Sequence, residues 1–316
     1  MILLTGATGF VGNALLNELV MRDQRVRVAT RYKMDKLPQG VDQCLVEDLS
    51  VNTDWSASLV GIDSIVHMAA RVHQMEENPQ DSLHKYRQTN VEGSLTLARQ
   101  AAASGVRRFI FMSSIKVNGE STLPGKPFLV EDPPRPVDPY GATKLEAEQG
   151  LAAISSETGM ELVVIRPPLV YGRGAKGNFQ TLGNWVKRGI PLPLGFINNK
   201  RSFVAIDNLV DFIITCIHHP KAGNETFLVG DGKDISTTEL LRKMKQATHK
   251  STCLVPVPSG LIVLLATLLG KRAVAQRLCG FLQVDISKAR ALLGWSPPVS
   301  IEQGLRGALM NEHDKL

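Results

Sequence analysis

"TGATGFVG" (residues 5–12) carries three glycines, Gly6, Gly9 and Gly12, between a short apolar run and an amphipathic helical pattern. A tight turn with close backbone approach favours residues that lack a Cβ atom. The N-terminus of the following helix offers free N–H groups and the positive end of its dipole to an anion. A glycine-rich turn between the first strand and a helix therefore predicts a site for the pyrophosphate of a dinucleotide.

Apolar runs and helical patterns alternate beyond this turn, which predicts an α/β fold with a doubly wound parallel sheet. Gly- and Pro-rich loops become frequent after Pro168 and predict a smaller, loop-rich α/β substrate domain. The apolar run at 226–232 can return to the main sheet, which would make that second domain discontinuous. We expect strands within 2–6, 25–30, 43–48, 62–70, 106–114 and 161–168, and helices within 10–22, 90–105 and 138–159.

These elements predict two domains. The sheet domain would consist of residues 1–168 plus roughly 203–232, and the substrate domain of residues 169–202 and 233–316.

Composition excludes several classes of protein. The chain has 316 residues, 43% of them apolar and 21% charged, as expected of a globular protein. A net charge of +6 favours anionic ligands, and we expect no nucleic-acid partner. The four cysteines have no metal-site or CxxC spacing, so we expect reduced thiols, no metal and a cytoplasmic location.

Two apolar segments could be taken for membrane signals. The opening "MILLTGATG" has no basic region or cleavage site, so we expect no signal peptide. The run "LIVLLATLLG" (261–270) is shorter than the roughly 20 residues that span a bilayer. We expect it to form a core or domain-packing helix and predict no stable membrane insertion, with contact to a membrane surface or membrane-bound partner as the minor alternative.

The end of the second predicted strand bears on the choice of cofactor. A carboxylate there would bind the adenosine ribose and repel a 2′-phosphate. The segment "ATRYK" instead supplies Thr30, Arg31 and Lys33, with no acid before Asp35. Since a guanidinium matches phosphate oxygens, we predict NADP(H), with NAD(H) as the alternative; a solvent-exposed basic turn would look the same. After the next strand, Asp48 and Leu49 are placed to contact the adenine.

Tyr140 and Lys144 lie four residues apart in "PYGATK", so both share one face of a predicted helix. A phenol with a pKa near 10 is a poor proton carrier at neutral pH. A neighbouring ammonium, together with the positive charge of an oxidised nicotinamide, would lower that pKa. The pair on its own is also common in surface packing.

The glycine triplet, "HMAA" (67–70), "TNVEG" around Asn90, the serines at 113–114, "PYGATK" and "RPPLVYG" (166–172) occur together and in order. In this the chain resembles the extended short-chain dehydrogenase/reductase family, above all its nucleotide-sugar branch. The similarity extends from Met1 to "DISKARALLGW" (285–295). It implies a Rossmann domain, a nicotinamide cofactor and a UDP-sugar substrate.

The resemblance also implies roles for single residues. Tyr140 would be the general acid/base, Lys144 would lower its pKa and hold the nicotinamide ribose, and Ser114 would bind the sugar oxygen beside Tyr140. No histidine lies near the serines in sequence, so we expect Ser114 to orient the substrate rather than act as a nucleophile. The expected cofactor-binding residues are Gly6, Thr8, Gly9, Phe10, Val11, Gly12, Arg31, Asp48, Leu49, Ala69, Ala70, Asn90, Ser113, Tyr140, Lys144, Pro167 and Val170; the expected substrate-binding residues are Arg71, Lys116, Asn118, Asn178 and Arg201.

Several reactions share this machinery. Ile115 and Lys116 follow Ser114 where a 4,6-dehydratase would carry acid/base carboxylates, so dehydration is not expected. The missing acid after the second strand favours an NADPH-dependent reductase. The resemblance to bacterial proteins of surface-polysaccharide synthesis implies that it reduces the 4-keto group of a UDP-4-keto-6-deoxy-N-acetylhexosamine. A UDP-sugar 4-epimerase is the alternative, and a non-catalytic NADP-binding or RNA-binding relative is the remote one. The resemblance further implies a homodimer, joined by a four-helix bundle built from 90–104 and 141–156.

Overall fold

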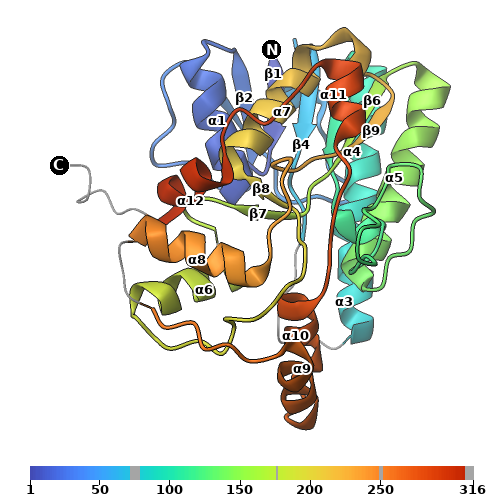
Figure 1. The fold of residues 1–316 in the computed structure, drawn as a ribbon. Coiled ribbons are helices and arrows are strands. Elements are labelled where there is room, and N and C mark those ends of the chain that lie inside the picture. Colours follow the sequence, from blue (N-terminus) through green and yellow to red (C-terminus); the bar gives the residue numbers. More distant parts are fainter. Residues whose placement is uncertain (72–78, 176, 249–251, 310–316) are drawn as a thin grey trace.

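Seven parallel strands form the main sheet, in the order β3-β2-β1-β4-β5-β6-β9 (Figure 1). The computed structural model describes residues 1–71, 79–175, 177–248 and 252–309. The order reverses between β1 and β4, and this switch point is where open α/β sheets bind ligands. The predicted doubly wound sheet is confirmed. Its strands are β1 (Ile2–Thr5), β2 (Val26–Thr30), β3 (Val41–Leu45), β4 (Ser64–His67), β5 (Arg108–Met112), β6 (Glu161–Arg166) and β9 (Glu225–Leu228).

Helices cover both faces of this sheet, and β1 and β4 at its centre are buried at every residue. Ile2 and Leu4 of β1 pack in one core with Leu16 of α1 (Phe10–Met21) and with α7 (Ile206–His218). Leu3 points the other way, into a core shared with the helices of the opposite face. Those helices are α2 (Ser56–Leu59), α4 (Ser94–Ala103) and α5 (Pro139–Thr158), while α11 (Ser287–Leu293) packs beside β9.

The helix expected over 90–105 differs from the one observed. α3 (Pro79–Tyr86) leads into a π-helical stretch, Arg87–Gly93, which continues as α4. A Cβ atom on Gly93 would come within 2.7 Å of the carbonyl carbon of Leu49, so the wide turn lies against the loop after β3. Apolar spacing carries no signal for a π-helix, which often marks a functional site.

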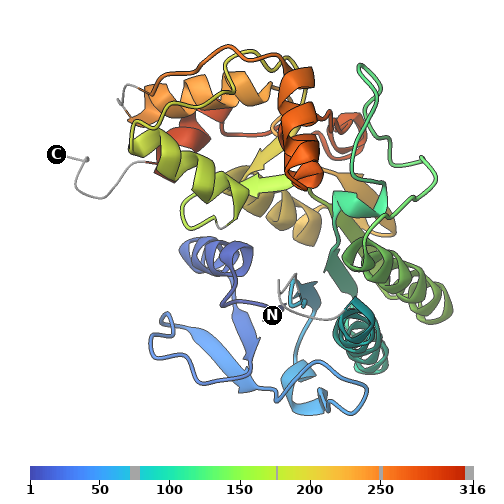
Figure 2. The same ribbon diagram turned by 90° about the horizontal axis from the view of Figure 1, so that it is seen from below.

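A second group of elements lies at the carboxyl edge of the sheet. β7 (Leu169–Tyr171) and β8 (Phe203–Ala205) pair in parallel, and α6 (Asn178–Lys187), α8 (Thr237–Thr248) and α12 (Ile301–Leu309) share a separate apolar core with them (Figures 1 and 2). The chain returns to the main sheet through β9, which pairs with β6 as the sequence allowed. The exact division into two domains stays a prediction.

The apolar run at 261–270 is not a core helix, and that prediction is wrong. It forms α9 (Ser259–Leu268), which makes a hairpin with α10 (Arg272–Cys279) and projects from the body of the protein (Figure 1). No residue of α9 is buried. Within the described ranges, no helix is long and apolar enough to cross a membrane.

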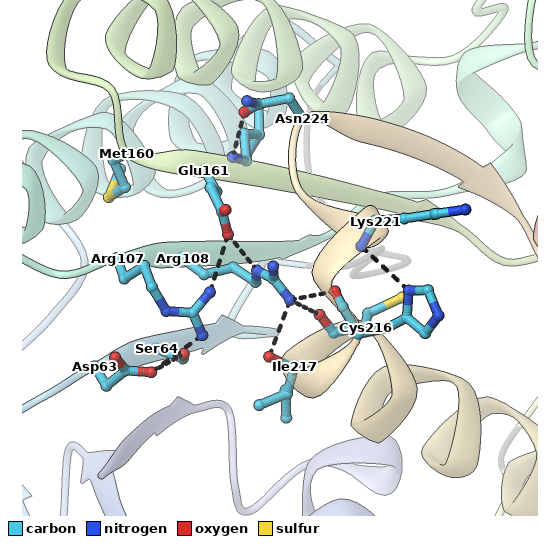
Figure 3. Close-up of polar contacts among 12 residues, drawn as sticks. Asp63, Ser64, Arg107, Arg108, Met160, Glu161, Cys216, Ile217, Lys221 and Asn224 are labelled. Carbon is cyan, nitrogen blue, oxygen red and sulfur yellow. Dashed lines mark hydrogen bonds and ion pairs between the residues drawn. The ribbon is translucent and has the colours of Figure 1, made fainter. Parts of the chain in front are cut away.

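At the amino edge of the sheet, the buried Arg108 side chain joins β5 to the end of α7 (Figure 3). Its Nη1 donates to the carbonyl oxygens of Cys216, Ile217 and His219 at 2.7, 3.0 and 2.9 Å. Its Nε donates to Glu161 at the start of β6, at 2.7 Å. The last carbonyls of a helix lack hydrogen-bond donors within the helix. Here the Arg108 guanidinium donates to them instead.

Candidate active site

The glycine turn requires its glycines. Gly6 has φ +75°, and a Cβ atom there would lie 2.7 Å from the amide nitrogen of Ala69. A Cβ atom on Gly12 would lie 2.0 Å from the carbonyl oxygen of Gly6. The first turn of α1 carries no acidic residue and no side-chain cap, and its leading N–H groups have no partners within the helix. This cradle fits the pyrophosphate of a dinucleotide.

A buried chain of hydrogen bonds joins the ends of β1 and β4. Thr5 Oγ1 lies 2.8 Å from His67 Nδ1, and His67 Nε2 lies 2.9 Å from Ser94 Oγ. Ser94 Oγ donates to the carbonyl oxygen of Asn90 at 2.7 Å, so it accepts from His67 and the imidazole proton is assigned to Nε2. Burial, with a smaller contribution from Lys144, lowers the pKa of His67 to about 3.

Asn90 lies at this edge but holds the backbone of the loop after β4. Its Oδ1 accepts from the amide of Arg71 at 2.8 Å, and its Nδ2 donates to the carbonyl of Arg71 at 3.1 Å. The loop that carries Ala69 and Ala70 is thereby fixed next to the glycine turn. Asn90 supports the expected cofactor site through that loop; a direct contact with the cofactor stays a prediction.

The end of β2 borders a hollow of about 490 Å³, lined by Thr8 and residues 30–36. Arg31, Lys33 and Lys36 contribute positive charge to this wall, and Asp35 is the single acid among its lining residues. The Arg31 guanidinium stacks 5.9 Å from the centroid of the Tyr32 ring. On the neighbouring loop, Asp48 accepts a hydrogen bond from Thr53 at 3.3 Å, so its carboxylate also shapes that loop.

The expected catalytic residues converge where α5 meets the segment after β5. Asp138 caps α5 by accepting from the Gly141 amide at 2.7 Å. A Cβ atom on Gly141 would lie 2.8 Å from the carbonyl oxygen of Lys116, so the first turn of α5 lies directly on the Ser114–Lys116 segment. Ser114 caps the short 3₁₀ helix Ile115–Val117, and its Oγ accepts from the Lys116 amide at 3.2 Å.

Tyr140 and Lys144 share one face of α5 as predicted, with the ammonium 5.9 Å from the centroid of the phenol ring. The Lys144 ammonium donates to the carbonyl of Met112 at 2.8 Å and lies 4.4 Å from the centroid of the Phe111 ring. Burial raises the pKa of Tyr140 to about 12 and lowers the pKa of Lys144 to about 7. In the chain alone, burial therefore outweighs the expected lowering of the phenol pKa by Lys144.

A buried ion pair behind these residues was not anticipated from the sequence. Glu148 and Arg166 form a two-pronged pair, with Nε–Oε1 at 3.0 Å and Nη2–Oε2 at 2.5 Å, and both side chains are 8% exposed. Glu148 also accepts a hydrogen bond from Ser113, and its charge raises the pKa of Lys144 against the effect of burial. The sequence did carry a signal for Glu148, because Tyr140, Lys144 and Glu148 are spaced four residues apart and so share one helix face.

Two of the expected substrate contacts have partners of their own. Asn118 is buried, accepts from Arg166 at 3.0 Å and donates to the carbonyl of Leu129 at 3.2 Å. Its amide is used inside the protein, which leaves the expected sugar contact without support. Lys116 forms an ion pair with Asp138, and its ammonium lies 5.9 Å from the centroid of the Tyr140 ring. It therefore borders the Tyr140 phenol rather than pointing freely into solvent.

The remaining expected residues come from the second group of elements. Asn178 is exposed at the start of α6. The Arg201 guanidinium is largely buried, which lowers its pKa, and Nη1 donates to the carbonyl of Gly280 at 3.1 Å. The carbonyl of Pro167 accepts from the amide of Ile115 at 3.0 Å, which ties the start of this region to the catalytic segment. Val170 lies in β7.

The glycine cradle, the switch-point sheet and the Ser–Tyr–Lys cluster define a nucleotide-sugar oxidoreductase of the extended short-chain type. The chain belongs to the NAD dependent epimerase/dehydratase family, which it matches over residues 2–230. It is 48% identical over 309 residues to a UDP-glucose 4-epimerase of Vibrio cholerae, covering 96% of this chain and 93% of that one.

More distant relatives agree with this assignment. The chain is 27% identical over 326 residues to an N-acetyl-alpha-D-glucosaminyl-diphospho-ditrans,octacis-undecaprenol 4-epimerase of Escherichia coli O157:H7, covering 98% and 95% of the two chains. Its fold is similar to that of UDP-glucuronic acid 4-epimerase from Bacillus cereus in complex with NAD, with a TM-score of 0.77 and 22% identity over 98% and 97% of the chains. The resemblance found in the sequence is confirmed, and the protein is an enzyme of this family.

Proposed function

We propose that the protein is a UDP-sugar 4-epimerase. The observation that carries this proposal is the 48% identity to the Vibrio cholerae UDP-glucose 4-epimerase, which extends over 96% of the chain. It replaces the 4-keto reduction that the sequence favoured and takes up the alternative given there. The exact UDP-sugar, glucose/galactose or their N-acetylated forms, is part of what the experiment below decides.

The geometry supports a division of labour among the chain's own residues. Tyr140 takes the proton from the sugar 4-hydroxyl and returns it on the opposite configuration, and Ser114 fixes that oxygen beside the phenol. Lys144 supplies positive charge 5.9 Å from the ring centroid. An oxidised nicotinamide held by the glycine cradle would supply hydride transfer from C4 and back to it, together with positive charge that helps the phenol to ionise. Since burial, together with the charges of Asp138 and Tyr86, holds the pKa of Tyr140 at about 12, proton transfer depends on the positive charges.

Binding of the nucleotide diphosphate is proposed for Arg201 and Asn178. Among the residues that the structure describes, the Arg201 guanidinium donates to one backbone carbonyl, that of Gly280. The rest of its fork is suited to bind phosphate oxygens in pairs. Arg71 and Lys116 are proposed to contact the sugar, Lys116 while it also pairs with Asp138.

The test compares two assays on the purified protein. In the first, UDP-glucose, UDP-galactose, UDP-GlcNAc and UDP-GalNAc are offered singly without added cofactor, and the 4-epimer is measured by chromatography. In the second, a UDP-4-keto-6-deoxy-N-acetylhexosamine is offered with NADPH. Epimer formation in the first assay with no NADPH oxidation in the second supports the proposal. The reverse result would restore the reductase.

The preference between NAD and NADP is a separate proposal. We keep the preference for NADP because Arg31, Lys33 and Lys36 line the hollow at the end of β2, where a 2′-phosphate would lie. An epimerase regenerates its oxidised cofactor at each turnover, so either dinucleotide satisfies the reaction. Mass spectrometry of the nucleotide released from the purified protein decides: NADP supports the basic wall as a phosphate site, and NAD contradicts it.

Two further expectations remain proposals. We propose a homodimer in which α4 and α5 of two copies form a four-helix bundle. These helices already pack closely within one copy, because a Cβ atom on Gly150 would lie 2.7 Å from Leu95. Light scattering at several protein concentrations measures the oligomeric state. A cytoplasmic location rests on the cysteine spacing and on the substrate class.

A further inference from the structure

The α9–α10 hairpin exposes apolar side chains that the proposed reaction does not use. Leu268 and Leu269 at its tip are 75% and 74% exposed. Leu261, Leu264 and Leu265 are also exposed, and with Leu268 they follow the i, i+3, i+4, i+7 spacing of one helix face. At about 1.5 Å per residue, a ten-residue helix extends roughly 15 Å, and the hairpin projects from the body of the protein (Figure 1).

The charge around the hairpin has one sign. No Asp or Glu occurs in the hairpin, Ser259 to Cys279, whereas three Lys or Arg residues do. Lys271 and Arg272 follow the leucine tip directly, and Arg277 lies further along α10; all three are exposed. Across the described residues, no ion pair involves these three side chains. A leucine tip rimmed by cations matches a surface that is both apolar and anionic.

The base of the hairpin is fixed to the proposed diphosphate site. Asn199 Nδ2 donates to the carbonyls of Leu278 and Gly280 at 3.1 and 2.8 Å. The carbonyl of Gly280 also accepts from Arg201 at 3.1 Å. The hairpin extends from the carboxyl-edge side of the sheet, where the β4 arrow points in Figure 1. A surface that received the leucine tip would therefore lie on the same side of the protein as the active site.

We propose that the α9–α10 hairpin docks on the surface of an anionic lipid bilayer. The leucines enter the boundary between head groups and acyl chains, while Lys271, Arg272 and Arg277 contact the anionic head groups. A second copy of the chain is a poorer occupant, because two hairpins joined by their leucines would bring like charges together. The hairpin is too short to span the membrane, so attachment is peripheral and reversible.

The test uses sedimentation of the purified full-length protein with vesicles. One set contains phosphatidylcholine alone, and the other contains equal parts phosphatidylcholine and phosphatidylglycerol. Two variants remove the proposed contacts: Leu268→Ser with Leu269→Ser, and Lys271→Gln with Arg272→Gln and Arg277→Gln. The control variant, Leu123→Ser with Lys126→Gln, alters an exposed leucine and an exposed lysine on another loop.

The wild type is expected to bind anionic vesicles at least about tenfold more tightly than neutral ones, with the difference shrinking as salt is added. Each hairpin variant should lose at least about tenfold in affinity for anionic vesicles, whereas the control should match the wild type. Turnover of UDP-sugars in solution should be unchanged in all variants, which separates this proposal from the proposed reaction.

Three results would overturn docking to lipid. The first is equal sedimentation with and without anionic vesicles. The second is unchanged binding by both hairpin variants. The third is a dimer, detected by light scattering without lipid, that Leu268→Ser with Leu269→Ser dissociates; this would assign the hairpin to a second copy of the chain.

Discussion

Two arginine–carboxylate pairs, each with a buried guanidinium, lie at opposite edges of the same sheet. At the amino edge, Arg108 joins Glu161 to the carbonyls that end α7 (Figure 3). At the carboxyl edge, Arg166 holds Glu148, whose charge acts on Lys144. The chemistry of the two pairs is alike, yet the first fixes a helix end and the second sets the charge around a titrating lysine. We therefore expect the pair far from the switch point to affect stability and the pair near it to affect activity, because ligands bind at the switch point.

The largest effect is expected from Tyr140→Phe at the carboxyl edge. Removal of the hydroxyl abolishes the proton carrier, so kcat should fall about 10³-fold. The midpoint of urea unfolding should stay within experimental error of the wild type. Steady-state kinetics and urea titration measure the two quantities. A kcat within threefold of the wild type would remove Tyr140 from the reaction.

Next in size is Arg108→Met at the amino edge. The variant leaves three α7 carbonyls without their charged donor, so the free energy of unfolding should fall by about 3 kcal/mol. Because Arg108 lies away from the switch point, kcat should not change. Urea unfolding measures the loss, and Arg166→Met is the matched variant at the other edge. If the folded Arg108→Met variant loses activity, the amino-edge pair does not act on stability alone, and the contrast between the two edges is wrong.

A smaller effect is expected from Glu148→Gln, which keeps size and shape but removes the charge. The pKa of Lys144, about 7 with Glu148 present, should fall, and the ammonium should be lost at lower pH. The alkaline limb of the kcat–pH profile should therefore move down by about one pH unit, with kcat at pH 7 reduced about fivefold.

Glu161→Gln is the control for this effect, because it removes the corresponding charge at the amino edge. Its pH profile should match that of the wild type, although its stability falls. If both variants shift the profile equally, the charge of Glu148 has no particular action on Lys144. If neither shifts it, Lys144 is not the titrating group.

A pH-dependent effect on stability is expected from His67, at the carboxyl end of β4. Folding lowers the pKa of His67 from its ordinary value of 6.5 to about 3, so the unfolded chain takes up a proton that the folded chain rejects. This contribution to stability is complete above pH 6.5 and declines as the pH falls toward 3. The slope between these values should approach about 1.4 kcal/mol per pH unit. Urea unfolding of wild type and His67→Gln should give a steep and a shallower pH dependence, respectively; equal slopes would contradict the assignment.

Much of the carboxyl edge could be predicted from the sequence because its signals are local. The glycine turn spans eight residues, and Tyr140 and Lys144 are one helical turn apart. The partners of Lys116 and Asn118 could not be predicted, because Asp138, Arg166 and Leu129 reach them only through the fold. The same holds for Arg108, whose carbonyl acceptors lie more than 100 residues away in the sequence.

The failure at α9 has a different physical origin. Apolar content indicates that a segment avoids water, but it does not say which surface the segment is buried against. Leu264 and Leu265 met every sequence criterion for a core position and are exposed in the chain. If the hairpin docks on lipid as proposed, the sequence was right about burial, and only the partner was missing.

The central claim, that the carboxyl edge performs epimerisation at C4, is tested most directly by following the hydride. UDP-glucose carrying deuterium at C4 is incubated with the purified protein without added cofactor, and the products are analysed by mass spectrometry and NMR. The account predicts UDP-galactose that retains deuterium at C4, since the hydride removed is returned to the same sugar. Two results would contradict it. One is that no 4-epimer forms from UDP-glucose or from any of the other UDP-sugars offered, and the other is a product whose C4 deuterium has been exchanged.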